Sequence, residues 1–105
     1  MKELISEVQA AVLTEYERAA AKHGEKHNSS HEAYAVILEE YEEAMNESKA
    51  FESALNWYWS YIKQNLGKED IDKRLEFMKA TAEKASAEWA QVAAMCYKAM
   101  KGTAV

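Results

Sequence analysis

Carboxylate side chains cluster along one predicted helix in the first half of the sequence, over residues 30–47. A rotation of about 100° per residue places three of its glutamates on one flank of an apolar stripe: Glu40, Glu43 and Glu47. Like charges three or four residues apart on a helix repel each other, and partial burial strengthens the repulsion until a cation or a proton is favoured. The pattern fits two interpretations: a carboxylate metal site, or the solvated shoulder of a Glu-rich bundle helix.

The last predicted helix carries a matching pair of polar residues, Glu88 and Gln91. They have the same angular offsets from their apolar stripe as Glu40 and Glu43 have from theirs. If the two stripes pack antiparallel, the polar ridges face each other and offer oxygen ligands to a hard cation such as Mg²⁺ or Mn²⁺. We therefore expect a metal site formed by these four residues. A di-iron site is not expected, because the sequence has no Glu-x-x-His motif.

The composition predicts an all-α protein. The 105 residues include no proline and only three glycines, and 49% are hydrophobic, which favours helices and a single domain over residues 1–105. A net charge of −5 without a basic cluster argues against nucleic acids or anionic membranes as partners. The only cysteine, Cys96, excludes an intrachain disulfide and is expected to be buried. The sequence has no uninterrupted apolar run that would predict a signal peptide or a membrane span, so we expect a cytoplasmic protein.

Apolar residues recur at helical spacing along almost the whole chain. They predict three helices, at residues 2–22, 31–66 and 68–101. The second helix is either continuous or broken between residues 46 and 49, and its core face is expected to contain Tyr34, Ile37, Tyr41, Ala44 and Met45. A helix of about 30 residues is about 45 Å long and needs an equally long partner. We therefore expect a bundle of long antiparallel helices that is completed by oligomerisation, as a homodimer or homotetramer.

Three histidines recur every four residues around the first predicted linker, at residues 23–30: His23, His27 and His31. Because Gly24 breaks the single helical face that a histidine metal site would need, we expect exposed linker histidines. Ser29 or Ser30 is the expected N-cap of the helix that follows.

Four aromatic residues lie close together near the end of the second predicted helix: Trp57, Tyr58, Trp59 and Tyr61. Their side chains project from different sides of the helix, so a single buried face cannot contain all four. We expect them in the core or in a subunit interface, with stacking on a ligand as the alternative.

The residues around the acidic cluster resemble a known family. Residues 38–43, Leu-Glu-Glu-Tyr-Glu-Glu, are similar to the Glu-Glu-x-x-Glu motif of the MazG-like all-α nucleoside triphosphate pyrophosphohydrolases. Residues 88–91, Glu-Trp-Ala-Gln, resemble the Glu-x-x-Asp motif that follows in those proteins on a later helix. The flanking residues 31–40 and 91–95 also look like small MazG-like proteins of phages and bacteria. The segment between the two motifs, residues 44–87, is longer here than the family usually has.

The resemblance implies hydrolysis of a nucleoside triphosphate between its α and β phosphates, which yields a monophosphate and pyrophosphate. It implies that Glu40, Glu43 and Glu88 hold Mg²⁺. Gln91 replaces the family's aspartate as a neutral and therefore weaker ligand. Glu39 or Glu47 is the expected residue to orient the attacking water.

Substrate contacts implied by this activity are base stacking on Trp57, Trp59 or Tyr34 and phosphate binding by Lys63 or Lys22. A competing hypothesis is a non-catalytic helical oligomer of the same family with a degenerate metal site, which the Gln91 substitution favours. A third hypothesis is an interaction module unrelated to nucleotides, with the exposed aromatic side chains as its partner surface.

Overall fold

The computed structural model describes residues 1–104 and contains three helices, in keeping with the predicted all-α class. Their bounds are Lys2–His23 for α1, Ser30–Lys63 for α2 and Lys68–Met100 for α3. α2 is uninterrupted, so the possible break between residues 46 and 49 does not occur. Within residues 1–104 there is no strand, and the only strand-like pairing is one isolated bridge between His27 and Thr103.

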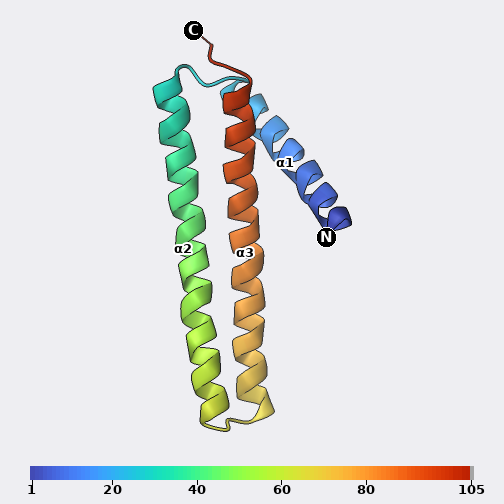
Figure 1. The fold of residues 1–105 in the computed structure, drawn as a ribbon, viewed down its shortest axis with the longest axis vertical. Helices are drawn as coiled ribbons and strands as arrows, with labels where there is room; N and C mark the ends of the chain where they lie inside the picture. Colours follow the sequence, from blue (N-terminus) through green and yellow to red (C-terminus); the bar gives the residue numbers. More distant parts are fainter. Residues whose placement is uncertain (105) are drawn as a thin grey trace.

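α2 and α3 lie side by side as a long antiparallel pair, joined by the short turn at residues 64–67 (Figure 1). The pair begins where Ser29 caps α2, its hydroxyl accepting a hydrogen bond of 3.1 Å from the backbone N–H of Glu32. Asn65 takes a positive φ of 55° in the turn, a conformation that asparagine tolerates better than most residues. The turn reverses the chain within four residues, so α3 runs back along the whole length of α2.

The contact face of α2 is built from small residues. Ala33, Ala44 and Ala54 are its buried positions, whereas Tyr34 and Tyr41 are 68% and 43% exposed. The expectation that these two tyrosines belong to the core is therefore wrong for this chain. Alanines let the backbones of two helices approach closely. The glutamate flank of α2 turns toward α3, and the partly exposed Tyr41 still meets α3, with its ring edge-on against Trp89 at 6.0 Å between centroids.

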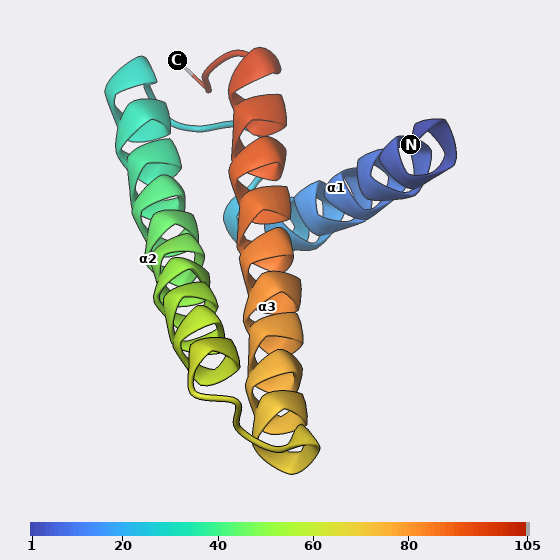
Figure 2. The same ribbon diagram turned by 60° about the horizontal axis from the view of Figure 1, so that its bottom comes forward.

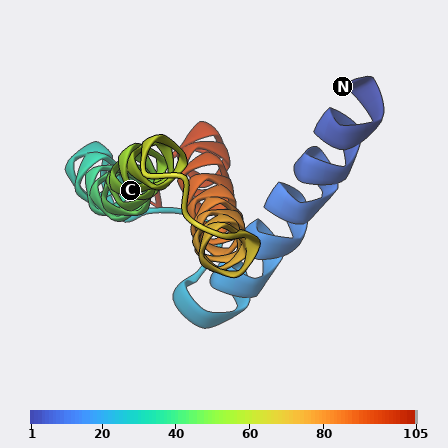
Figure 3. The ribbon, with the colours of Figure 1, turned by 90° about the horizontal axis from the view of Figure 1, so that it is seen from below.

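α1 leaves the helix pair at a steep angle, and only its carboxyl-terminal half packs on α3 (Figures 2 and 3). Tyr16 anchors it: the ring lies edge-on against Tyr97 at 5.0 Å between centroids, and its hydroxyl donates to the backbone oxygen of Glu25 at 2.9 Å. The apolar side chains of its first turns are exposed, among them Leu4, Ile5 and Val8. The predicted stripe of α1 is thus only half used within one chain.

The linker between α1 and α2 is tied to the end of the chain. The backbone N–H of Ala104 donates to the backbone oxygen of His27 at 2.8 Å, next to the bridge with Thr103. His27 is 1% exposed, which corrects the expectation of an exposed linker histidine, whereas His23 and His31 are exposed as expected. Cys96, expected to be buried, is exposed.

None of the helices within residues 1–104 is both long enough and apolar enough to span a membrane.

Candidate metal centre

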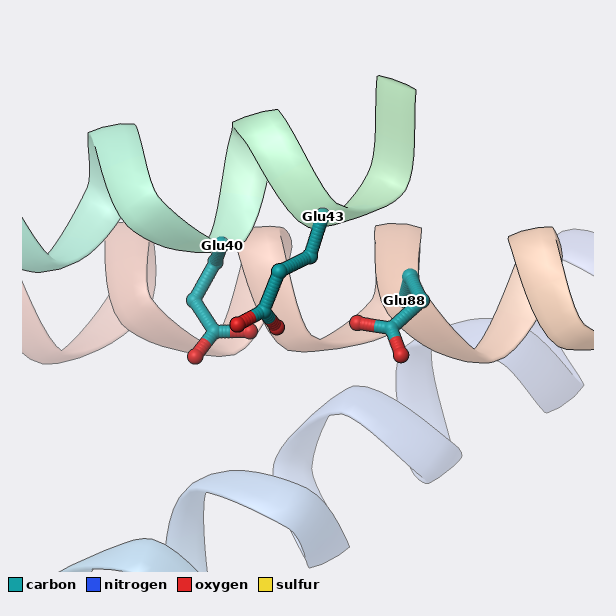
Figure 4. A group of neighbouring side chains, drawn as sticks. All are labelled: Glu40, Glu43 and Glu88. Atoms are coloured by element: carbon teal, nitrogen blue, oxygen red, sulfur yellow. The ribbon is translucent and has the colours of Figure 1, made fainter. Parts of the chain in front are cut away.

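Three of the four predicted ligands converge between α2 and α3. Glu40 and Glu43 project from α2, and Glu88 projects from α3 toward them (Figure 4). One carboxylate oxygen of each residue lies within 4.8 Å of the others. Antiparallel packing with the glutamate flank of α2 turned toward α3 produces this arrangement, because the two ridges then meet along the helix contact.

The cluster holds acceptor atoms that no donor satisfies. Glu40 and Glu88 are half-buried, and the Oε2 atom of each is buried without a hydrogen-bond partner within residues 1–104. A buried acceptor without a donor costs free energy, typically about 1–3 kcal/mol and more for a charged group. The site is therefore chemically suited to a cation or a proton.

Burial raises the pKa of Glu40 above its ordinary value, and the neighbouring carboxylates of Glu43, Glu88, Glu39 and Glu15 raise it further. Glu15 belongs to α1, so α1 brings a carboxylate close to the cluster formed by the other two helices. A divalent cation would reverse the repulsion, since its charge favours the ionised form of every carboxylate around it.

A cleft of about 610 Å³ lies beside the cluster, between all three helices and the first linker. Glu40 and the fourth predicted ligand, Gln91, line it, as does Glu39. Gln91 lies one helical turn beyond Glu88 on α3, which is the spacing of side chains on one helix face. The acidic cluster thus adjoins a space large enough for a small molecule.

Glu47, the second residue expected to orient a water, has a different environment. Its Oε1 forms an ion pair with Nζ of Lys84 at 3.1 Å, which links α2 to α3. It is neither a member of the three-carboxylate cluster nor part of the cleft lining. Of the two candidates only Glu39 lies in the cleft.

Three of the predicted substrate contacts, Trp57, Trp59 and Lys63, lie at the other end of the helix pair, whereas another, Lys22, lines the cleft. Trp57 is 17 residues from Glu40 along α2, which corresponds to about 25 Å of helix. Trp57 is covered by the guanidinium of Arg74, 4.6 Å from the ring centroid, and the Lys63 ammonium lies 5.7 Å from the ring centroid of Trp59. Within one chain the structure therefore does not bring Trp57, Trp59 or Lys63 to the acidic cluster.

The cleft lining also includes residues that were not predicted as part of the site, among them His27 and Lys98. A signal for Lys98 exists in the sequence, because it follows Gln91 and Met95 at steps of four and three on one face of α3. The sequence holds no such signal for His27, whose backbone is tied to residues 103 and 104.

Comparisons of the chain with protein-family models, with curated proteins and with solved structures found no match. Its fold and site define an all-α protein with a three-carboxylate cluster beside a cleft. The resemblance to MazG-like proteins rests on the two sequence motifs and their flanking residues alone.

Proposed function

We propose that this chain is a Mg²⁺-dependent nucleoside triphosphate pyrophosphohydrolase, which converts a nucleoside triphosphate and water into a monophosphate and pyrophosphate. The observation that carries the proposal is the convergence of Glu40, Glu43 and Glu88 within 4.8 Å, with two buried oxygen atoms that no donor satisfies. Carboxylates from two helices that meet beside an open cleft are suited to holding a hard cation next to a phosphate chain.

In this proposal the three glutamates hold Mg²⁺ (or Mn²⁺), and Gln91 adds a neutral carbonyl oxygen from the cleft wall. When bound, the cation would neutralise phosphate charge and make a nearby water more acidic. Glu39 lines the cleft and has no ion pair within residues 1–104, so its carboxylate is free to accept a proton from the attacking water. The assignment of the water-orienting role to Glu39 rather than Glu47 follows from the ion pair of Glu47 with Lys84.

We further propose that the chain works as a homo-oligomer, with a dimer as the simplest case. A compact monomer of 11.9 kDa exposes about 6,000 Å², whereas this chain exposes 7642 Å². The excess, about 1,600 Å², lies within the range of about 1,000–2,500 Å² that each subunit buries in an obligate homodimer. The exposed apolar turns of α1 and the aromatic end of α2 are the surfaces that a second copy would cover.

A non-catalytic helical oligomer is the second candidate function. Gln91 favours it, because an amide in place of a carboxylate removes one of the charges that attract a cation. The ion pair between Glu47 and Lys84 favours it too. Glu47 belongs to the acidic ridge formed by Glu40, Glu43 and Glu47, and the ion pair uses its carboxylate to join α2 to α3 rather than to bind a cation.

Thermal unfolding with and without millimolar Mg²⁺ or Mn²⁺ tests the metal site. A cation that binds only the folded state raises its stability, by about 2.7 kcal/mol at a hundredfold excess over the dissociation constant. We expect the parent to gain stability and a Glu40→Gln, Glu43→Gln double variant to gain none. The matched control is Glu42→Gln, Glu52→Gln, which removes two exposed carboxylates from the same helix and should respond as the parent does.

Pyrophosphate release from a panel of ribo- and deoxyribonucleoside triphosphates then tests the reaction. Activity that requires the cation and is lost in Glu40→Gln, Glu43→Gln supports the enzyme. A cation-dependent gain in stability without release from any triphosphate supports the non-catalytic oligomer, and no gain at all overturns the metal site.

A further inference from the structure

Side chains that can donate hydrogen bonds gather at the linker end of the cleft, away from the acidic cluster. Three of them, Lys22 of α1, His27 of the linker and Lys98 of α3, line this part, which we term the basic end. Lys98 lies two helical turns beyond Gln91 on α3, about 10 Å along the helix axis. One cleft therefore has a carboxylate end and a basic end.

Lys98 has a side chain that is almost wholly buried, and its ammonium group has no counterion within residues 1–104. Its residue is 5% exposed, and within residues 1–104 its ammonium group forms no hydrogen bond or ion pair. Lysine residues are rarely buried to this extent unless they are paired. The ammonium group of Lys98 has three N–H donors, and because none of them has a partner among the described residues, they favour an anion in the cleft.

His27 also has unsatisfied polar atoms in this part of the cleft. Both ring nitrogens are buried and lack a hydrogen-bond partner within residues 1–104. The nearest carboxylate, that of Glu32, is 4.0 Å from Nδ1, which is too far for a hydrogen bond. Glu32 is already engaged, since its Oε2 accepts a hydrogen bond of 2.9 Å from the side chain of Asn28. The imidazole therefore has an N–H group available for another acceptor.

The backbone fixes this imidazole in position. The oxygen of His27 accepts the N–H of Ala104 at 2.8 Å, and the residue forms the bridge with Thr103. A donor whose position is fixed by the fold loses little entropy when it binds a ligand. Together with Lys98 and the more exposed Lys22, it offers donors from three separate segments of the chain.

We propose that the basic end binds a phosphate group and, resting on the proposed function, that this group belongs to the pyrophosphate part of a nucleoside triphosphate. Phosphate presents several acceptor oxygens in a tetrahedral arrangement, which suits donors that converge from different segments better than the planar oxygen pair of a carboxylate does. The carboxylate end would then hold the cation, and the basic end would hold the phosphates that leave as pyrophosphate.

Titration calorimetry with inorganic pyrophosphate in EDTA tests the basic end without any metal. We expect the parent to bind and Lys98→Met to raise the dissociation constant at least tenfold. Lys98→Met removes an unpaired buried charge, so it is expected to fold. The matched control is Lys79→Met on the same helix, whose lysine is exposed and paired with Glu83 at 2.8 Å; it should bind as the parent does.

His27→Phe provides a second variant, because it keeps a planar ring and removes both unsatisfied nitrogens. We expect it to remain folded and to bind pyrophosphate less tightly than the parent. Absence of pyrophosphate binding by the parent, or equal weakening by Lys98→Met and Lys79→Met, would overturn the basic end as a phosphate site.

The response of the same proteins to Mg²⁺ separates this proposal from the proposed function. Lys98→Met should keep the full gain in thermal stability with Mg²⁺ while it loses pyrophosphate. If the parent binds pyrophosphate but not Mg²⁺, the phosphate site stands and the enzyme does not. If it binds Mg²⁺ but not pyrophosphate, the phosphate site alone fails.

Discussion

Glu47 of α2 and Lys84 of α3 form an ion pair of 3.1 Å that joins the two long helices. Glu47 lies one helical turn from Glu43, so the pair ends the acidic ridge at this point. One of the ridge's three glutamates is thereby neutralised, and the unpaired charge is concentrated at Glu40 and Glu43, opposite Glu88.

Because of this ion pair, Glu47→Gln should affect stability and leave metal binding unchanged. We expect a loss of roughly 0.2–1 kcal/mol, the usual range for a partly exposed pair, in the free energy of unfolding by urea. Lys84→Gln should cost about the same, since either change breaks one contact. A Glu47→Gln variant that no longer gains stability with Mg²⁺ would show instead that Glu47 belongs to the metal site.

The raised pKa of Glu40 predicts how the metal-free protein responds to pH. The folded state holds this proton to a higher pH than the unfolded state, whose ordinary value is 4.5. The stabilisation of the folded state by the proton on Glu40 is therefore complete below about pH 4.5, and it is lost as the pH rises through the pKa of Glu40 in the folded state. Glu40→Gln removes this loss.

We expect Glu40→Gln in EDTA to become more stable relative to the parent as the pH rises from 4 to 8, by about 0.5 kcal/mol. Urea unfolding at each pH measures the difference. The exposed residue Glu52 supplies the control, and Glu52→Gln should show a nearly constant difference from the parent across that range. A flat profile for Glu40→Gln would mean that the three carboxylates do not interact in solution.

Gln91→Asp should strengthen the metal site. The change adds a carboxylate beside Glu88 and Glu40, and we expect Mg²⁺ affinity to rise about tenfold, which corresponds to about 1.4 kcal/mol. Without metal the same change should lower the melting temperature, because a further like charge joins the cluster. A variant that is destabilised in EDTA and equally destabilised with Mg²⁺ would argue that the cleft wall at Gln91 lies outside the cation's reach.

The exposed apolar turns of α1 predict that Val8→Glu disrupts self-association. An exposed surface substitution usually changes stability by less than about 0.5 kcal/mol, so a larger loss here would indicate an interface. Light scattering after size-exclusion chromatography should show an oligomer for the parent and a monomer for Val8→Glu. Thr14→Glu introduces the same charge at another exposed position of α1 and should leave the oligomer intact. A monomeric parent would refute the oligomer outright.

The positions of the helices were predictable because they depend on local signals. Ser29 caps α2 through its own hydroxyl. Gly102 has a positive φ of 91° just after α3, and its N–H donates to the backbone oxygen of Ala99 at 3.1 Å. Such signals act over a few residues and can be read from one sequence.

The rotation of α2 was less predictable. Hydrophobicity alone favours a core face with Tyr34 and Tyr41, but close packing of alanines turns the neighbouring glutamates inward. The proximity of Glu40, Glu43 and Glu88 could still be predicted from the sequence. The glutamates lie at the same angle from the apolar stripe on both helices, and this match does not depend on which flank of α2 is more buried. The buried His27 could not be predicted, because its environment comes from residues far away in the sequence.

The hydrogen bond between His27 and Ala104 also has a consequence for the order of events during synthesis. A ribosome makes residues 103 and 104 after all three helices, so the linker acquires this anchor only after α3 has been synthesised. The hairpin of α2 and α3, whose contacts lie close in sequence around the turn, can form before that point. α1 is made first, yet by this reasoning it is the last helix to reach its final orientation.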